Sequence, residues 1–393
     1  MIEAPAAIPT DEFAQRRERA RQLAAEKGLD GLLVCARGGG TLDRYGDVLY
    51  LSNFYSPFPY IPDLAGNWTA RAHAFVVLPV AGEAILISDV PNDGRIAMPE
   101  SGIVYTDFVL ESTIRALEDA GLSSGKVGLV GGDVLPVDTY KAIEGALPGI
   151  EWSDGSDVLK RLRAVKSAGE IALLDHSAKV GSRTIEAMMA AAEPGATHGD
   201  VVAAGQQVLN GAGGILYNSF MASGTGGDSP VMVKSNFPTW GSPEPLRDGH
   251  WLRLGISGVV GGYYFDVSRS KAIGPPTNRQ IDLFEAAIAC VEAGIGAVRI
   301  GATAEQLAAA GLGKQRDLGF DLKGVFSGLG HGIGLGWDSP WLAPGDETVL
   351  EPGMVLNFER TITQDGFVGD FEETVVVTED GYDRLTDAQI RFW

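Results

Sequence analysis

Cysteine and basic residues are both scarce in this chain. Its 393 residues include only two cysteines, Cys35 and Cys290, which lie far apart in apolar runs. This excludes a disulfide framework and a zinc–thiolate site, and it predicts buried free thiols. Lys and Arg number 31 against 51 Asp and Glu, a net charge of -20. Because that charge repels phosphate backbones and anionic lipids, we expect a small-molecule substrate, cationic or zwitterionic, and no nucleic-acid or membrane partner. A need for solubility alone would also explain the acidity.

Long uncharged apolar runs are missing too. Arg253 and Glu285 interrupt the best candidates for a membrane span. The first residues lack the basic segment and apolar core of a secretory signal, so we expect a cytoplasmic protein. A chain of this length exceeds one compact core and predicts two domains.

The first half of the sequence alternates helix and strand patterns. Residues 11–27 predict a helix capped by Thr10, and residues 30–36 predict a buried strand. Residues 74–79 and 83–89 predict a hairpin. We place the domain boundary near residue 160, which gives an α/β domain over 1–160 and a second domain over 161–393.

The second domain contains an internal repeat. Residues 186–197 and 292–303 both begin with Glu-Ala and end with Gly-Ala-Thr, and residues 247–255 match residues 351–359 at a similar spacing. In both copies a long helix ends before Gly-Ala-Thr, and the threonine is placed to cap the next helix. The pattern predicts two similar α+β halves related by a pseudo-two-fold axis, with a cleft where they meet.

Each half also predicts a strand hairpin. The first pairs 251–257 with 263–270, and the second pairs 354–361 with 371–377. Asp266, Glu359 and Glu372 interrupt these apolar strands, and His331 lies in a glycine-rich run. A buried carboxylate without a partner costs several kcal/mol, so a metal, an arginine or a proton must neutralise these acids. Three carboxylates and one imidazole suit a divalent ion such as Mn, Fe, Co or Zn.

Four segments now carry a resemblance: LRAVKSAGEI, GHGIGL, EPGMVLNFE and FEETVVVTEDG are similar to the pita-bread family of creatinase, aminopeptidase P, prolidase and methionine aminopeptidase. The first domain is similar to the creatinase-type N-terminal domain. The resemblance implies a creatinase-type α/β domain followed by an α+β pita-bread domain, in a homodimer. In metal-dependent members five acids and histidines hold two metals, and four of those positions match Asp266, His331, Glu359 and Glu372.

The fifth ligand of that pattern is missing. An aspartate is expected eleven residues before Asp266, where this sequence has Gly255. The resemblance therefore implies either one divalent ion, held by the four remaining ligands, or none. Arg253 shares a strand face with Gly255 by two-residue alternation. If that face points into the cleft, the guanidinium can pair with the carboxylates and replace metal charge; if it does not, Arg253 lies on the surface.

Two further departures concern histidines that peptidase members carry. Asp228 and Asp338 occupy those positions here, and each precedes Ser-Pro. Either could act as a general base, bind a cationic group, or simply cap a loop. Arg253, Tyr264 and Trp337 are the candidate substrate-binding residues, and Trp240 and Trp341 add aromatic surface that would favour a cation.

The resemblance and its departures favour a hydrolase that cleaves a C–N bond, of amide, amidine or related type, in a small polar substrate. Glu359, His331, Asp228 and Asp338 are the candidate catalytic residues, and peptide hydrolysis is not expected. The alternatives are a lyase of the dimethylsulfoniopropionate-lyase type on the same scaffold and a binding protein without catalysis.

Overall fold

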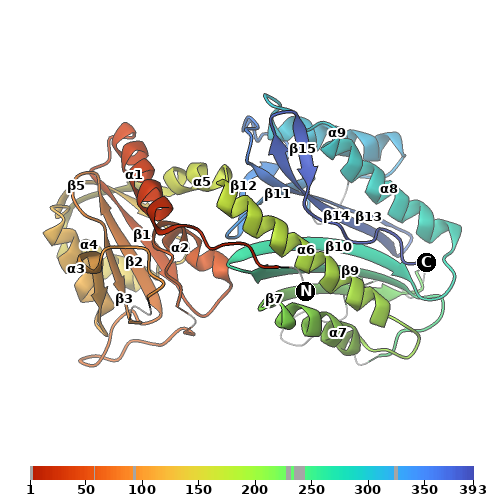
Figure 1. The fold of residues 1–393 in the computed structure, drawn as a ribbon, viewed down its shortest axis with the longest axis horizontal. Helices are drawn as coiled ribbons and strands as arrows, with labels where there is room; N and C mark the ends of the chain where they lie inside the picture. The colour runs from red at the N-terminus through yellow and green to blue at the C-terminus, as the bar shows by residue number, and fades with distance from the viewer. Residues whose placement is uncertain (1–2, 57, 92–93, 227–231, 234–243, 323–325) are drawn as a thin grey trace. The chain divides into compact units, whose positions relative to one another are not determined.

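The computed structural model describes residues 3–56, 58–91, 94–226, 232–233, 244–322 and 326–393. The chain forms two compact units, one over Ala7–Arg163 and the other over Ala164–Trp393 together with the first six residues (Figure 1).

The first unit is built on a six-stranded sheet in the order β4-β3-β2-β1-β5-β6. The expected hairpin is confirmed, because β2 and β3 pair antiparallel. The expected cap is wrong: Thr10 lies inside the first helix, and Pro9 holds the N-cap position. The elements are α1 (Thr10–Glu26), β1 (Gly31–Arg37), α2 (Gly46–Ser52), β2 (His73–Pro79), β3 (Ile85–Ser88), β4 (Ile103–Tyr105), α3 (Val109–Asp119), β5 (Ser124–Val130), α4 (Val137–Ala146), β6 (Gly149–Asp154) and α5 (Ser156–Ala164).

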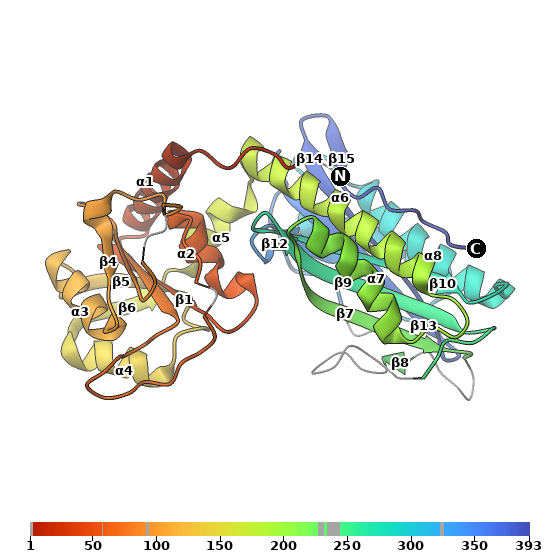
Figure 2. The same ribbon diagram turned by 60° about the horizontal axis from the view of Figure 1, so that its bottom comes forward.

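The second unit contains two sheets, in the orders β10-β9-β7-β8 and β12-β11-β13-β14-β15. The long helix α6 packs on β10, and α8 packs on β14 in the same way (Figures 1 and 2). The elements are α6 (Ala168–Ala191), α7 (His198–Gly211), β7 (Ile215–Gly224), β8 (Met232–Val233), β9 (Trp251–Val260), β10 (Tyr263–Ala272), α8 (Asn278–Ile295), α9 (Ala304–Asp317), β11 (Gly330–Ile333), β12 (Trp337–Leu342), β13 (Val355–Gln364), β14 (Phe367–Thr378) and β15 (Gly381–Arg384).

The internal repeat corresponds to structure. A helix pair and a strand hairpin occur twice, as α6-α7 with β9-β10 and as α8-α9 with β13-β14. The two sheets meet along β10 and β14. Thr197 caps α7, since its hydroxyl accepts from the Asp200 backbone N–H at 3.2 Å and its own N–H donates to Asp200 Oδ2 at 2.8 Å. In the second copy only the reverse bond forms, from the Thr303 N–H to Gln306 Oε1 at 3.3 Å.

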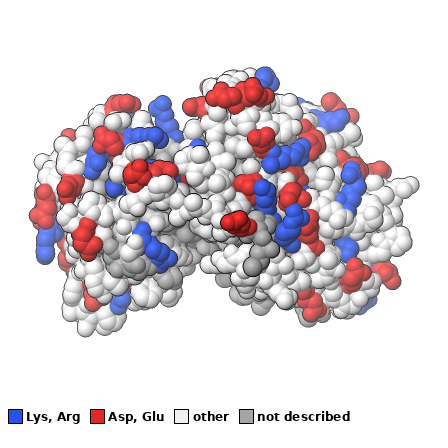
Figure 3. All heavy atoms as spheres, viewed as in Figure 1, with Lys and Arg blue, Asp and Glu red and all other residues white. Residues whose placement is uncertain are grey.

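The distribution of charged side chains and the apolar character of the helices can be compared with what the composition predicts. On the face that Figure 3 shows, the described Lys and Arg side chains are interspersed with Asp and Glu and form no continuous basic patch. None of the helices in the described part of the chain combines the length and apolar character that crossing a membrane requires.

Candidate active site

A cavity of about 580 Å³ opens in the second unit, between strands of both halves. That volume is typical of a small-molecule site. Four of the predicted ligands and two of the predicted substrate-binding residues border it. The lining residues are Phe220, Ala222, Arg253, Gly255, Asp266, Phe326, His331, Trp337, Trp341, Glu359, Thr361, Thr363, Val368 and Glu372.

Strand register brings the acids together. Glu359 on β13 and Glu372 on β14 are direct cross-strand partners. Asp266 lies on β10, whose backbone is tied to β13 because Asn357 Nδ2 donates to the Asp266 carbonyl at 2.9 Å. Directly opposed carboxylates on two strands repel each other, so this pairing is costly unless a cation or a proton lies between them.

His331 enters the cavity from β11 beside a residue that must be glycine. Gly330 has a φ of +148°, and a Cβ there would lie 1.9 Å from the Asn357 carbonyl oxygen. This close approach brings β11 against β13 and fixes the place of the imidazole. It also gives a physical reason for the glycine-rich run seen in the sequence.

The hydrogen bonding of His331 leaves an acceptor facing the acids. Burial lowers its pKa to about 4, so the ring is neutral at pH 7. Its Nδ1 lies 2.9 Å from the Gly332 carbonyl oxygen, which can only accept, so Nδ1 carries the proton. Nε2 is then an acceptor, 3.8 Å from Asp266 Oδ2 and 3.9 Å from Glu359 Oε1. Asp266 Oδ2 and Glu359 Oε1 thus both lie near the lone pair of the imidazole.

The three carboxyls are strongly perturbed, mainly by burial. Burial raises the pKa of Asp266 to about 6, against the opposing effect of the Trp337 hydrogen bond. Burial and the Asp266 charge raise the pKa of Glu359 to about 7. The pKa of Glu372 also lies well above its usual range, with burial the largest cause. Its Oε2 is buried without a hydrogen bond to any described residue.

The residues match a metal in donor type but not in placement. Three carboxylates and a neutral imidazole are ligands that a divalent ion accepts. Within the described ranges, however, no group of three or more His, Cys, Asp and Glu side chains is placed so that it could hold a metal ion. The expected metal therefore stays a prediction.

Arg253 points into the cavity, which settles one alternative that the sequence left open. Its Nε donates to Asp370 Oδ2 at 2.5 Å, and Asp370 is completely buried. Gly255 leaves room beside the Arg253 side chain, because a Cβ at position 255 would make only ordinary contacts, the nearest at 3.5 Å. Sequence analysis missed Asp370. Two-residue alternation along β14 places it on the same strand face as Glu372 and could have revealed it.

One wall of the cavity is aromatic. Trp337 Nε1 donates to Asp266 Oδ2 at 2.9 Å, which ties the indole to the acid cluster. The His331 ring lies between Trp337 and Trp341, with centroid distances of 5.7 and 5.6 Å. Both tryptophans remain about half exposed.

The other candidates do not join this group. Asp338 is buried on β12, does not border the cavity, and forms an ion pair with Lys166 at 3.5 Å, so its expected role as general base is not supported. Tyr264 is also absent from the lining and packs on Tyr217 at 5.5 Å. Asp228 and Trp240 lie outside the described residues.

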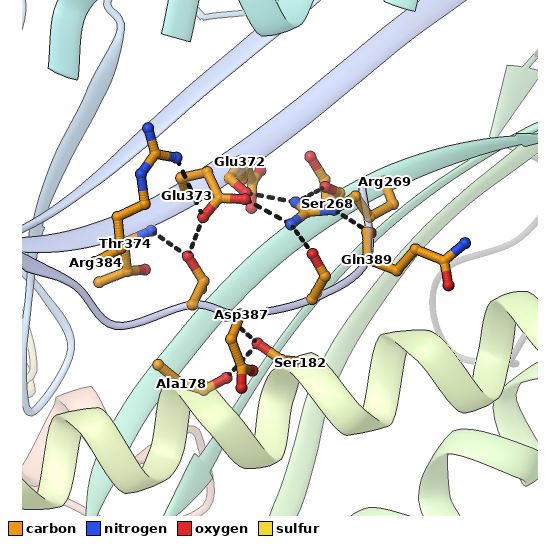
Figure 4. Close-up of polar contacts among 12 residues, drawn as sticks. Ala178, Ser182, Ser268, Arg269, Glu372, Glu373, Thr374, Arg384, Asp387 and Gln389 are labelled. Atoms are coloured by element: carbon orange, nitrogen blue, oxygen red, sulfur yellow. Dashed lines mark hydrogen bonds and ion pairs between the residues drawn. The ribbon is translucent and has the colours of Figure 1, made fainter. Parts of the chain in front are cut away.

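A buried network behind the cavity fixes Glu372. Arg269, completely buried on β10, donates to the Glu372 carbonyl at 2.7 Å and to Glu373 Oε1 at 2.6 Å (Figure 4). It also donates to the carbonyls of Gln389 at 2.9 Å and Ala388 at 3.2 Å, which holds the C-terminal segment against the strands. Because Glu373 faces this network, its neighbour Glu372 faces the cavity.

Fold and pocket together define a two-unit α/β protein whose duplicated second unit encloses a carboxylate-rich site. Residues 172–379 match the metallopeptidase family M24, and residues 16–165 match the creatinase/prolidase N-terminal domain. The chain therefore belongs to the metallopeptidase family M24. This confirms the family resemblance and the fold expected from the sequence.

Relatives match along nearly the whole chain. The ectoine hydrolase of Halomonas elongata is 23% identical, with 98% of each chain covered. The creatinase of Bacillus sp. is 25% identical, with coverage of 96% of this chain and 90% of the relative. The crystal structure of dipeptidase PepE from Mycobacterium ulcerans aligns with a TM-score of 0.79 at 25% identity, covering 98% of this chain and 99% of the other.

Proposed function

We propose that this chain is a hydrolase that cleaves a C–N bond, of amide, amidine or related type, in a small substrate with a cationic group. The observation that supports it most is the convergence of His331 Nε2, Asp266 Oδ2 and Glu359 Oε1, at 3.8 and 3.9 Å from the imidazole, on the border of one cavity. Two relatives that match almost end to end are named ectoine hydrolase and creatinase, so a non-peptide substrate fits the family.

Charge balance favours the cationic group. Three acids, Asp266, Glu359 and Glu372, line the cavity, and Arg253 is the one cationic side chain among the described lining residues. Its guanidinium is already paired with the buried Asp370 behind it. A cationic substrate group supplies the charge that the acids lack, and the indoles of the aromatic wall attract it as well.

Glu359 is the proposed proton carrier. Its raised pKa of about 7 lets it exist in both protonation states near neutral pH. As a carboxylate it takes a proton from the water that attacks the carbon of the C–N bond. As a carboxylic acid it returns that proton to the departing nitrogen when the bond breaks. Asp266 and Glu372 hold the cationic group, and His331 accepts a hydrogen bond through Nε2.

At most one metal ion is proposed per chain. Asp266, His331, Glu359 and Glu372 are the donors that a single ion would use, but as placed they do not form a metal site, so no step of the proposed reaction depends on a metal. A second ion has no donor at Gly255, and Arg253 already occupies Asp370. The homodimer and the cytoplasmic location stay predictions.

Elimination by a lyase is the alternative that the test must separate. The relatives reported above are named ectoine hydrolase, creatinase and dipeptidase, none of them a lyase, and no contact in the described residues favours elimination over hydrolysis. A panel of small cationic amides and amidines in heavy-oxygen water distinguishes the two by mass spectrometry of the products. Hydrolysis places one solvent oxygen in the product for each bond cleaved. Cleavage without solvent oxygen in the product would refute the proposal.

A further inference from the structure

One side of the Arg253 guanidinium is hydrogen-bonded to Asp370, and the other side borders the cavity. Its Nε donates to Asp370 Oδ2 at 2.5 Å, and the second oxygen of Asp370 accepts from Thr361 Oγ1 at 2.8 Å. Asp370 is completely buried, and its backbone N–H donates to Ser270 Oγ at 3.3 Å. The carboxylate is therefore fixed and in turn orients the guanidinium.

The terminal nitrogens of Arg253 remain available. Neither makes a hydrogen bond to any residue that the structure describes, although the side chain is only 18% exposed and borders the cavity. Gly255 keeps the space in front of them open, since a Cβ there would lie 3.9 Å from Nη2. A mostly buried guanidinium with unused donors, aimed into open space, is suited to bind a planar anion.

We propose that Arg253 binds a carboxylate of the substrate, which makes the substrate a small zwitterion. The inference rests on the proposed function for the cationic end, which the acid cluster takes. A simple anion would face the three acids that line this cavity, and the one guanidinium among the described lining residues that attracts it is already paired with Asp370. A zwitterion brings its own cation to those acids and so satisfies both ends of the pocket.

Three small probes of nearly equal shape measure separately what a positive and a negative charge on the ligand contribute to binding. Glycine betaine carries a quaternary ammonium and a carboxylate, choline keeps only the cation, and 3,3-dimethylbutanoate keeps only the anion. Isothermal titration calorimetry on the full chain should show betaine binding at least about tenfold more tightly than either of the others, because each lacks one charge-assisted contact. Equal affinities for betaine and choline would overturn the proposal.

Variants test whether the difference in affinity between betaine and choline comes from the Arg253 guanidinium. Arg253→Met should remove the preference for betaine over choline, because it weakens betaine binding without weakening choline binding. Because this change leaves Asp370 buried without its partner, the double variant Arg253→Met/Asp370→Asn repeats the test without the orphaned charge. Arg299→Met, on the exposed surface, is the matched control and should bind all three probes like the wild type. Unchanged betaine selectivity in both Arg253 variants would refute the assignment.

The proposed role of Arg253 in binding and the proposed hydrolysis can be tested independently. The probe titrations need no catalysis, so they test Arg253 even if hydrolysis is not found. If substrates are identified, Arg253→Met should raise KM at least about tenfold with kcat little changed. A fall in kcat at constant KM would contradict a role in carboxylate binding.

Discussion

Removing the Arg269 side chain should strongly destabilise the second unit. Arg269 is completely buried and pairs with Glu373 Oε1 at 2.6 Å. Its guanidinium also satisfies backbone carbonyls of β14 and of the C-terminal segment (Figure 4). Arg269→Met retains a side chain of comparable length, but it deletes every one of these donors.

The size of the loss follows from what is left behind. Glu373 would stay buried with the Thr386 hydroxyl and with Arg384, whose Nη1 is 3.8 Å away. Removing one partner of a buried ion pair costs about 3–5 kcal/mol, and Arg384 would compensate only part of the charge left on Glu373. The variant Arg269→Met/Glu373→Gln should recover part of that loss, since the orphaned charge is gone.

Urea unfolding followed by circular dichroism measures the difference. Arg279→Met is the matched control, because Arg279 pairs with Asp365 at 2.8 Å on the surface and such a pair contributes only about 0–1 kcal/mol. A loss for Arg269→Met below about 1 kcal/mol, or no larger than that of the control, would refute the reasoning.

Four further predictions concern the cavity. The raised pKa values of Asp266 (about 6) and Glu359 (about 7) outweigh the lowered pKa of His331 (about 4), so these groups bind more protons in the folded chain than in the unfolded one. The free energy of unfolding should therefore fall as pH rises from about 4 to about 7. Urea titrations across that range check this, and Glu359→Gln should flatten the slope. Trp337→Phe keeps the ring but loses the 2.9 Å bond to Asp266, and kcat/KM should drop about tenfold; an unchanged value would contradict the role of that bond. Gly255→Asp fits the open space and adds a carboxylate near Arg253, so betaine binding should weaken at least about tenfold by calorimetry. Elemental analysis of the wild type should find no more than one metal ion per chain, and two would be incompatible with the site described.

Much of the fold could be predicted because it depends on local and repeated patterns. Apolar strand segments in each half of the repeat predicted the two hairpins, which the structure extends to Trp251–Ala272 and Val355–Thr378. The internal repeat predicted the paired halves. The cap at Thr10 was wrong: the helix begins one residue earlier, after an extended Pro9 that makes no side-chain cap bond, and helix boundaries vary by a residue or two.

The site was harder to predict because it depends on contacts between distant strands. Alternation shows which residues share a face, but it does not show which face borders the cavity, so the orientation of Arg253 stayed open. Its partner Asp370 comes from another strand, 117 positions along the chain. The surroundings of Asp338 were hard to predict for a related reason: its ion-pair partner Lys166 is remote in sequence and gives no local signal.

The central claim is that Glu359 carries the proton for C–N hydrolysis at this acid cluster. Steady-state kinetics on small cationic amides and amidines should compare the wild type with Glu359→Gln, and with Glu351→Gln as an exposed control. We predict that Glu359→Gln lowers kcat by about 100-fold or more, whereas Glu351→Gln is unaffected. A Glu359→Gln protein that turns over at the rate of the control would contradict the claim.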